Sequence, residues 1–394
     1  MKRTILAFAL AALAAGCATR QQQPPPATTS ATSTATSTSG PDAKGGEQDL
    51  PVGAIPNATL HDAQRNRDLD LVIEYPTRGG PYPVIVFSHG YGGSNRGYTT
   101  LTEFWTSRGY VCIKPNHADA GAIREAAFSP VMPPPARETR EQRRERRERE
   151  QNPQPAAAPP PDPESIWTGQ TENDYRNRVA DIKLVLDNLG TIEDKYPELK
   201  GRMDKAKVGV GGHSYGALTT MLAGGLRVTK NGATITLGDP RVKAGIAMSP
   251  QGPSPEIGTT ADSYASIRTP MLFMTGSRDF GIEGQSPEWR RQAYENSTAP
   301  DKWLVWIDGA THMTFTGGVG ALSQAEIDRR QQMMRDAQAR GMNPNVSSPF
   351  QRGRGFGTVR IATLAFWDAY LKEDAKAKDR LSGFNSESVK IEKK

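Results

Sequence analysis

Short apolar runs alternate along the chain with longer stretches in which apolar residues recur every three or four positions. The runs have the length of buried strands, and the longer stretches have the period of amphipathic helices. The predicted strands are residues 69–75, 84–87, 110–114, 208–210, 242–248, 271–275 and 303–307. The predicted helices are residues 98–108, 175–189, 217–222 and 359–371. This alternation predicts an α/β fold with a mostly parallel central sheet and helices on both faces.

Two local signals set boundaries within this pattern. Gly190 follows the second predicted helix, and we expect that helix to end there. The dipeptide Asn231-Gly232 predicts the tight turn of a β-hairpin, because both residues tolerate a positive φ.

Several segments lack this periodicity and divide the chain into regions. Residues 18–50 are mainly Gln, Pro, Thr, Ser, Ala and Gly, with too little apolar area to fold, so we expect a disordered tether. Residues from about 121 to 169 form a charged, Pro-rich insertion. The folded domain is therefore predicted to be 51–372, with a candidate cap at about 317–357, and residues 373–394 are expected to be a polar tail.

The first 17 residues have the pattern of an export signal: a basic start, an apolar run too short to span a bilayer, and small residues before Cys17. The sequence Leu13-Ala14-Ala15-Gly16-Cys17 resembles the lipobox of bacterial lipoproteins, which implies that Cys17 is lipidated. Cys112 lies in a predicted strand and offers Cys17 no obvious partner. We expect an exported protein, lipid-anchored in the bacterial cell envelope on the periplasmic side of the outer membrane. A plain signal peptide cut near Cys17 is the alternative.

The formal charge of +6 does not favour a nucleic-acid partner. Arginines and glutamates are interleaved at 137–150, which cancels most of the local field, although attraction to anionic lipid headgroups stays open. No closely spaced pair of histidines or cysteines suggests a metal site, and no cofactor is expected. The oligomeric state is left open.

The most informative motif is Gly212-His213-Ser214-Tyr215-Gly216, which stands between a predicted strand and a predicted helix. In this arrangement a sharp, strained turn lifts a serine above the sheet as a nucleophile. Side chains two positions before and after the serine would clash in such a turn, and Gly212 and Gly216 remove that clash. The sequence therefore predicts that Ser214 is a catalytic nucleophile.

A serine nucleophile needs a base, usually a histidine held by a carboxylate. Of the five histidines, His312 is the one that comes after Ser214 with a predicted strand just before it. In this fold the acid lies between them in the chain, on a loop after a strand, and Asp279 has that position. The rival acids are Asp262, Asp301 and Asp308.

Acyl transfer also needs backbone N–H donors for the negative oxygen of its tetrahedral intermediate. The residue after the nucleophile, Tyr215, supplies one predicted donor. The Gly-rich loop at 88–93 follows an early strand, and we expect the second donor there from Tyr91, with Gly90 as the alternative.

The segments 87–92, 175–181 and 211–216 resemble the dienelactone-hydrolase-related α/β hydrolases, a group that includes platelet-activating-factor acetylhydrolases and bacterial polyester-cleaving cutinases. The resemblance covers roughly 51–371 and implies an α/β-hydrolase fold and ester hydrolysis through an acyl-enzyme. Two positions depart from it. Ser249-Pro250-Gln251 stands where the acetylhydrolases carry their acid, so Asp279 matches the cutinase arrangement instead. Dienelactone hydrolases proper use a cysteine nucleophile, whereas this chain has Ser214.

Together these features predict a serine carboxylester hydrolase that acts on a small-molecule or lipid ester, with a membrane contact through its lipid anchor. The insertion and the cap, which contains Met333, Met334 and Met342, are the segments expected to influence substrate choice, although these methionines equally fit a packed helix. An exported peptidase or amidase of the same fold and an inert ligand-binding lipoprotein are the alternatives.

Overall fold

The computed structural model describes residues 49–120, 172–281, 284–317 and 349–394. The predicted signal sequence, Cys17, nearly all of the tether, the insertion and most of the candidate cap with its three methionines lie outside the described residues. Within the described ranges, no helix combines the length and apolar character needed to cross a bilayer.

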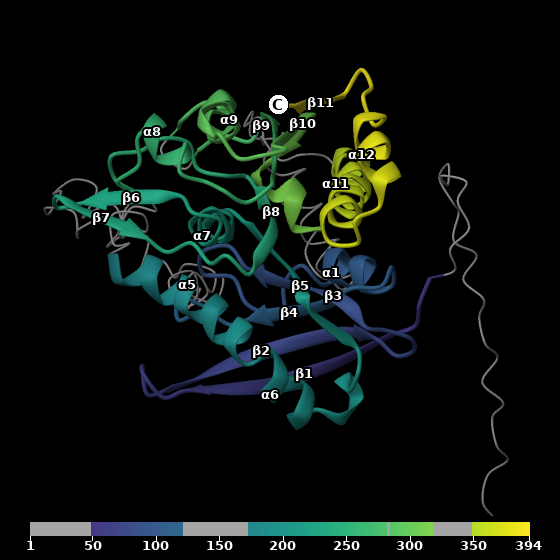
Figure 1. The fold of residues 1–394 in the computed structure, drawn as a ribbon. Helices are drawn as coiled ribbons and strands as arrows, with labels where there is room; N and C mark the ends of the chain where they lie inside the picture. The colour runs from purple at the N-terminus through teal and green to yellow at the C-terminus, as the bar shows by residue number, and fades with distance from the viewer. Residues whose placement is uncertain (1–48, 121–171, 282–283, 318–348) are drawn as a thin grey trace, which may run out of the picture. The chain divides into compact units, whose positions relative to one another are not determined.

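A nine-stranded sheet forms the centre of the described fold, in the order β1-β2-β4-β3-β5-β8-β9-β10-β11 (Figure 1). Its strands are β1 (Val52–Asp62), β2 (Arg67–Pro76), β3 (Tyr82–Ser88), β4 (Val111–Pro115), β5 (Met203–His213), β8 (Val242–Met248), β9 (Met271–Arg278), β10 (Trp303–Thr311) and β11 (Val389–Lys393). The strands from β4 to β10 in this order pair in parallel, whereas β1, β2 and β11 pair antiparallel at the two edges. This is the predicted α/β-hydrolase fold.

Helices cover both faces of the sheet (Figure 1). They are α1 (Thr99–Thr106), α5 (Glu172–Asp187), α6 (Leu189–Lys195), α7 (Tyr215–Ala223), α8 (Ala261–Tyr264), α9 (Pro287–Asn296), α11 (Pro349–Tyr370) and α12 (Ala375–Ser382). One core cluster joins the sheet to α1 and α11, and two others join it to α5, α7 and α9 on the opposite face.

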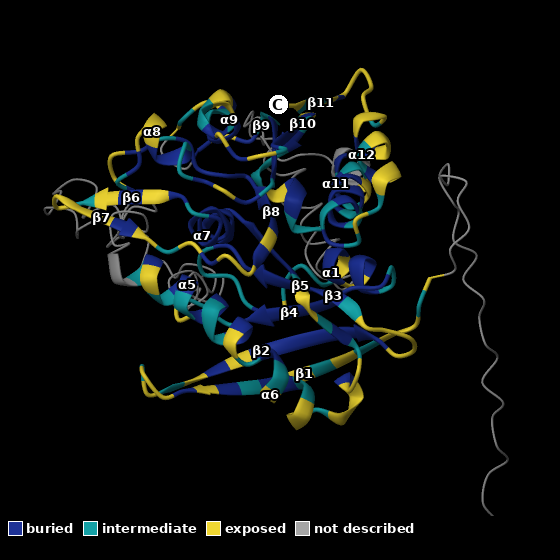
Figure 2. Cartoon of the chain, viewed as in Figure 1, coloured by how far each residue is buried: buried dark blue, intermediate teal, exposed yellow. Residues whose placement is uncertain are grey.

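The central strand β3 shows how a continuous apolar run builds both cores. Ile85 and Phe87 belong to the cluster under α1 and α11, whereas Val84 and Val86 belong to a cluster on the opposite face. All four side chains are buried, as expected for a parallel strand covered on both sides. Figure 2 shows the same pattern, with buried central strands and exposed residues on the outer helices and turns.

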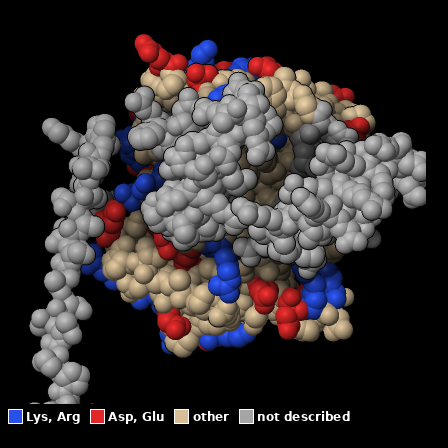
Figure 3. Space-filling model, turned by 180° about the vertical axis from the view of Figure 1, so that it is seen from behind, with Lys and Arg blue, Asp and Glu red and all other residues tan. Residues whose placement is uncertain are grey.

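The neighbouring strand β5 carries glycine where a helix approaches its backbone. A Cβ atom at Gly209 would lie 2.6 Å from Cζ3 of Trp367, which is fully buried on α11. The missing side chain therefore lets the indole pack directly against β5. On the face shown in Figure 3, basic and acidic side chains of the described residues are interspersed.

The predicted hairpin is confirmed: β6 (Arg227–Lys230) and β7 (Ala233–Thr236) pair antiparallel, with positive φ at Asn231 and Gly232. The prediction for Gly190 is wrong, because it lies inside α6. The break falls at Asn188, with φ of −114°, and α6 continues to bury Leu189 and Ile192 beside α5.

The predicted polar tail is also wrong. Residues 375–382 form α12, and Val389–Lys393 forms β11, which pairs with β10 as an edge strand. Leu381 and Val389 are buried, but so few apolar positions give too weak a pattern to detect in the sequence. The last long helix, α11, begins at 349 rather than 359, inside the range predicted for the cap. The strand β1, which alternates between buried and exposed positions in part of its length, was not predicted.

Candidate active site

The predicted elbow lies where β5 ends and α7 begins. Ser214 stands between them with φ of 57° and ψ of −119°, a conformation that costs a non-glycine residue free energy. Its N–H donates to the carbonyl oxygen of Met248 at 2.9 Å, which ties the turn to the neighbouring strand β8. Such stored strain is typical of a side chain held in place for function.

The two elbow glycines are required by close backbone contacts. A Cβ atom at Gly212 would overlap the backbone of Gly216, as the sequence predicts. A Cβ atom at Gly216 would overlap the carbonyl group of Ser88, a contact that the sequence did not predict. The second glycine therefore also lets the elbow touch the loop at 88–93.

Asp279 and His312 come together from two neighbouring strands. Asp279 directly follows β9, and His312 begins the 3₁₀ turn η2 (His312–Thr316) directly after β10. The Nδ1 atom of His312 lies 3.1 Å from Oδ1 of Asp279. The carboxylate is fully buried, whereas the imidazole side chain is 34% exposed. A buried acid that orients a reachable imidazole is the geometry of a general base.

The elbow histidine, His213, contacts His312 directly. The rings of His213 and His312 have centroids 4.6 Å apart, and Nε2 of His213 lies 2.9 Å from the backbone oxygen of His312. Because a carbonyl can only accept, His213 Nε2 is the donor. Within the described residues, Ser214 Oγ and His312 share no hydrogen bond, and this contact is often long in substrate-free hydrolases.

Asp279 is the acid that contacts His312 among the four candidates in the described ranges. Asp301 instead pairs with Lys378 and Lys393 at the surface, and Asp308 accepts a hydrogen bond from Ser277 Oγ at 2.6 Å. Asp262 lies in the first turn of α8.

Arg290 is a site residue that the sequence did not reveal. It lies buried on α9, and its Nε atom is 2.9 Å from Oδ1 of Asp279. Its Nη2 atom is 3.3 Å from His312 Nδ1. Burial alone would raise the pKa of Asp279, but Arg290, followed by His312, lowers it below its ordinary value. The carboxylate therefore stays ionised beside the imidazole.

The two predicted oxyanion donors belong to adjacent residues in space. The rings of Tyr91 and Tyr215 meet edge to face with centroids 6.0 Å apart. Gly90 N–H donates to the hydroxyl of Tyr98 at 3.2 Å, and that hydroxyl lies 2.8 Å from Nδ1 of His213. Since His213 Nε2 is protonated, its Nδ1 accepts from Tyr98. This chain of hydrogen bonds holds the loop at 88–93 against the elbow.

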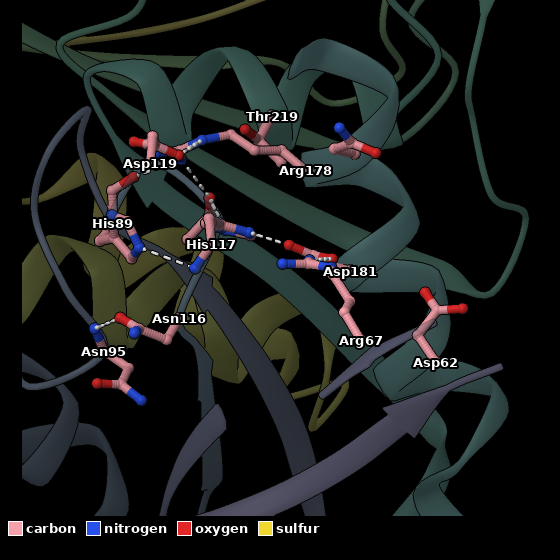
Figure 4. A network of polar contacts seen from close by, with 12 residues as sticks. Asp62, Arg67, His89, Asn95, Asn116, His117, Asp119, Arg178, Asp181 and Thr219 are labelled. Carbon is pink, nitrogen blue, oxygen red and sulfur yellow. Dashed lines mark hydrogen bonds and ion pairs between the residues drawn. The ribbon is translucent and has the colours of Figure 1, made fainter. Parts of the chain in front are cut away.

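The remaining histidines lie elsewhere. His61 is exposed on β1 and pairs with Asp68, while His89 and His117 are buried in a polar network next to the loop at 88–93 (Figure 4). No group of three or more His, Cys, Asp or Glu side chains suited to a metal ion occurs among the described residues. Cys112 is buried in β4 with a free thiol, and burial raises its pKa.

Comparison with known proteins gives two partial similarities. A family model described as Chlorophyllase matches residues 51–125, a range that contains the loop at 88–93. Platelet-activating factor acetylhydrolase from Cavia porcellus is 27% identical over 249 residues, which cover 60% of this chain and 49% of that relative. The chain thus matches about half the length of this curated relative. Both similarities favour an esterase-type α/β-hydrolase.

Proposed function

We propose that this protein is a serine carboxylester hydrolase in which Ser214 is the nucleophile, His312 the general base and Asp279 the acid that orients it. The backbone N–H groups of Tyr91 and Tyr215 are the proposed oxyanion donors. The observation that carries the proposal is the hydrogen bond between buried Asp279 and partly exposed His312, whose ring contacts His213 in the strained elbow of Ser214.

The proposed reaction has two half-reactions. Ser214 Oγ attacks the ester carbonyl carbon while its proton passes to His312 Nε2, and the negative oxygen is held by the two amide groups. Collapse of this intermediate expels the alcohol, which takes the proton from His312, and leaves an acyl-enzyme. Water then attacks the acyl carbon with His312 again as the base, which releases the acid and restores the Ser214 hydroxyl.

Exposed apolar side chains support an apolar ester as substrate. Phe280 directly follows Asp279 and is 54% exposed, and Met313 directly follows His312 and is 53% exposed. Arg290 Nη2 donates to the Phe280 carbonyl oxygen at 2.9 Å and lies 3.3 Å from His312 Nδ1, so the backbone of Phe280 lies close to the residue before Met313. An apolar rim around a few polar groups is typical of sites for apolar ligands.

Lipidation at Cys17 and anchoring in the cell envelope are part of the proposal. Their support is the sequence of the first 17 residues alone. Metabolic labelling with a radioactive fatty acid tests them, since a Cys17→Ala variant should lose the label.

The central test is Ser214→Ala, assayed on p-nitrophenyl esters of increasing acyl length alongside peptide anilides. We expect kcat to fall by about 10⁵- to 10⁶-fold while the far-UV circular dichroism spectrum is kept. The exposed Ser382, on α12, provides a matched control, because Ser382→Ala should leave turnover unchanged. Turnover that survives Ser214→Ala would refute the proposal, and faster cleavage of anilides than of esters would favour a peptidase. A fluorophosphonate probe should label the wild type and spare the variant.

A further inference from the structure

A largely buried ion pair between Arg178 and Asp119 contacts the loop that carries Tyr91, and Figure 4 shows both residues near His89 of that loop. Arg178, on α5, is 2% exposed. Its Nε and Nη2 atoms lie 2.9 Å and 2.6 Å from the two carboxylate oxygens of Asp119, which follows β4. This bidentate geometry fixes the plane of the guanidinium. Burial opposes ionisation of Asp119, yet Arg178 lowers its pKa to about 2.

The same ion pair holds the backbone on both sides of Tyr91. Arg178 Nη1 donates to the carbonyl oxygen of His89 at 2.7 Å, and Nη2 lies 3.4 Å from that of Gly90. Asp119 Oδ2 accepts the N–H of Gly92 at 3.0 Å. The carbonyl groups before Tyr91 and the amide after it therefore face one guanidinium–carboxylate pair.

The ring of His89 adds a further donor to the same carbonyl. Its Nδ1 atom lies 2.7 Å from the oxygen of Gly90, and its Nε2 atom lies 3.2 Å from the backbone nitrogen of His117. A carbonyl can only accept and a backbone N–H can only donate, so His89 is held as the neutral tautomer with its proton on Nδ1. The N–H of Gly93 also reaches the Gly90 oxygen, at 3.0 Å.

The geometry of the peptide bond lets these contacts set the direction of the Tyr91 N–H. Gly90 C=O and Tyr91 N–H belong to one planar trans peptide, in which the two groups point in opposite directions. Because the carbonyl is turned toward Arg178 and His89, the Tyr91 N–H is turned away from them. Arg178 also lies over the ring of Tyr215, 4.3 Å from its centroid. It thus contacts one proposed oxyanion donor directly and, through the Gly90 carbonyl, the peptide that precedes the other.

We propose that Arg178, Asp119 and His89 are positioning residues that aim the Tyr91 N–H at the developing oxyanion. This inference rests on the proposed function. The three residues do not touch the substrate; they act through the peptide between Gly90 and Tyr91.

A second layer of buried groups supports this clamp. His117 Nε2 lies 2.8 Å from Ser88 Oγ, and its Nδ1 lies 2.8 Å from Asp181, which also pairs with Arg67 (Figure 4). Asp181 can only accept, so His117 is protonated at Nδ1 and its Nε2 accepts from the Ser88 hydroxyl. That hydroxyl in turn accepts from Arg178 Nη1 at 3.2 Å. Every donor in this series of hydrogen bonds meets an acceptor, so the series holds the Arg178 guanidinium through the Ser88 hydroxyl.

The test variant is Asp119→Asn, which keeps the size of the side chain and removes its charge. The two N–H donors are placed to stabilise an oxygen anion. A shift of the Tyr91 N–H should therefore reduce the stabilisation of an oxygen anion more than that of a sulfur anion. We therefore compare kcat/KM for an ester with that for the matching thionoester, in which sulfur replaces the carbonyl oxygen. We expect kcat/KM for the ester to fall by about 10- to 100-fold, and the ester-to-thionoester rate ratio to fall with it.

Glu74→Gln is the matched control. Glu74 and Lys114 form another buried ion pair, on β2 and β4, that has no contact with the loop at 88–93 among the described residues. Its variant should lower the melting temperature without changing the rate ratio. If Asp119→Asn does not fold, Arg178→Lys replaces it, because a lysine keeps the charge but cannot make the same set of directed contacts.

An unchanged rate ratio in a folded Asp119→Asn or Arg178→Lys protein would overturn the inference and leave the pair a purely structural role. Failure of the proposed function looks different: the wild type would then not hydrolyse the ester, or Ser214→Ala would still do so.

Discussion

Two pairs of neighbouring histidines near the elbow invite comparison. The rings of His89 and His117 have centroids 4.9 Å apart, and those of His213 and His312 are 4.6 Å apart. In the first pair, both nitrogens of each ring are held by protein groups. In the second pair His213 is held in the same way, but His312 is held by Asp279 at Nδ1 and has a side chain that is 34% exposed.

Under the proposed function, this difference means that a place next to Ser214 in the chain is not enough to make a histidine the base. A base needs a lone pair that substrate can reach, and a carboxylate that stabilises the imidazolium. Burial, followed by the charge of Arg178, lowers the pKa of His89 and of His117, and burial, followed by His312, lowers that of His213. These three rings are neutral connectors between loops, and His312 is the one that we propose as the proton acceptor.

The strongest test of this comparison removes one histidine from each pair by mutation. His312→Gln removes the proposed base, and kcat should fall by about 10⁵- to 10⁶-fold. His117→Gln removes a connector, so we expect a lower melting temperature and a far smaller loss of kcat. Steady-state kinetics on a p-nitrophenyl ester and thermal unfolding measure both. A larger loss of kcat in His117→Gln would show that the histidines have been assigned the wrong way round.

The second prediction concerns Asp279, the carboxylate that contacts His312. Asp279→Asn should lower kcat by about 10⁴-fold, because an amide can no longer stabilise the imidazolium. Asp308→Asn is the matched control, at an exposed position in the neighbouring strand β10. We expect it to leave kcat within about twofold, as for an ordinary surface substitution. The reverse order of the two effects would reassign the acid.

The smallest expected effect is a change in how the free energy of unfolding depends on pH. The pKa values of His89, His117 and His213 lie below the ordinary value of 6.5 in the folded protein, so the unfolded chain binds more protons near and below that value. Their contribution to stability is therefore present above pH 6.5 and is lost as the pH falls, by at most about 1.4 kcal/mol per pH unit for each histidine.

Urea unfolding at pH 7, 6 and 5 measures this loss. The free energy of unfolding should fall less steeply with acid in His117→Gln than in the wild type, since other titrating groups are common to both proteins. His61→Gln is the control, because that ring lies at the surface. An equal slope in His117→Gln and wild type would mean that His117 is not held neutral.

The parts of the fold that the sequence predicted are those with a strong local pattern. The strands β3, β8, β9 and β10 are continuous apolar runs, and the elbow combines a strand, a required pair of glycines and a helix. The edge strands β1 and β11 mix buried and exposed positions, so neither is a continuous apolar run. The sequence of α11 does not separate into an apolar and a polar face, so its start could not be placed. Weak periodicity gave no basis for predicting them.

The candidate site divides in the same way. Chain order and strand ends made Ser214, Asp279 and His312 the candidates. Arg290, Arg178 and Asp119 make contacts across the fold that no local spacing in the sequence predicts. One signal was available for Asp119: it follows β4, whose carboxyl end lies beside that of β3 and hence beside the loop at 88–93. Parallel strands bring such loops to one edge of a sheet.

The contact between Gly216 and the carbonyl group of Ser88 has a consequence for protein engineering. Two loops whose main chains touch without intervening side chains cannot be reshaped one at a time. We therefore expect libraries that vary the elbow or the loop at 88–93 to lose the proposed activity before they alter its selectivity. Room for diversification lies instead at Phe280 and Met313, which are 54% and 53% exposed and so tolerate exchange better than the loop contact does.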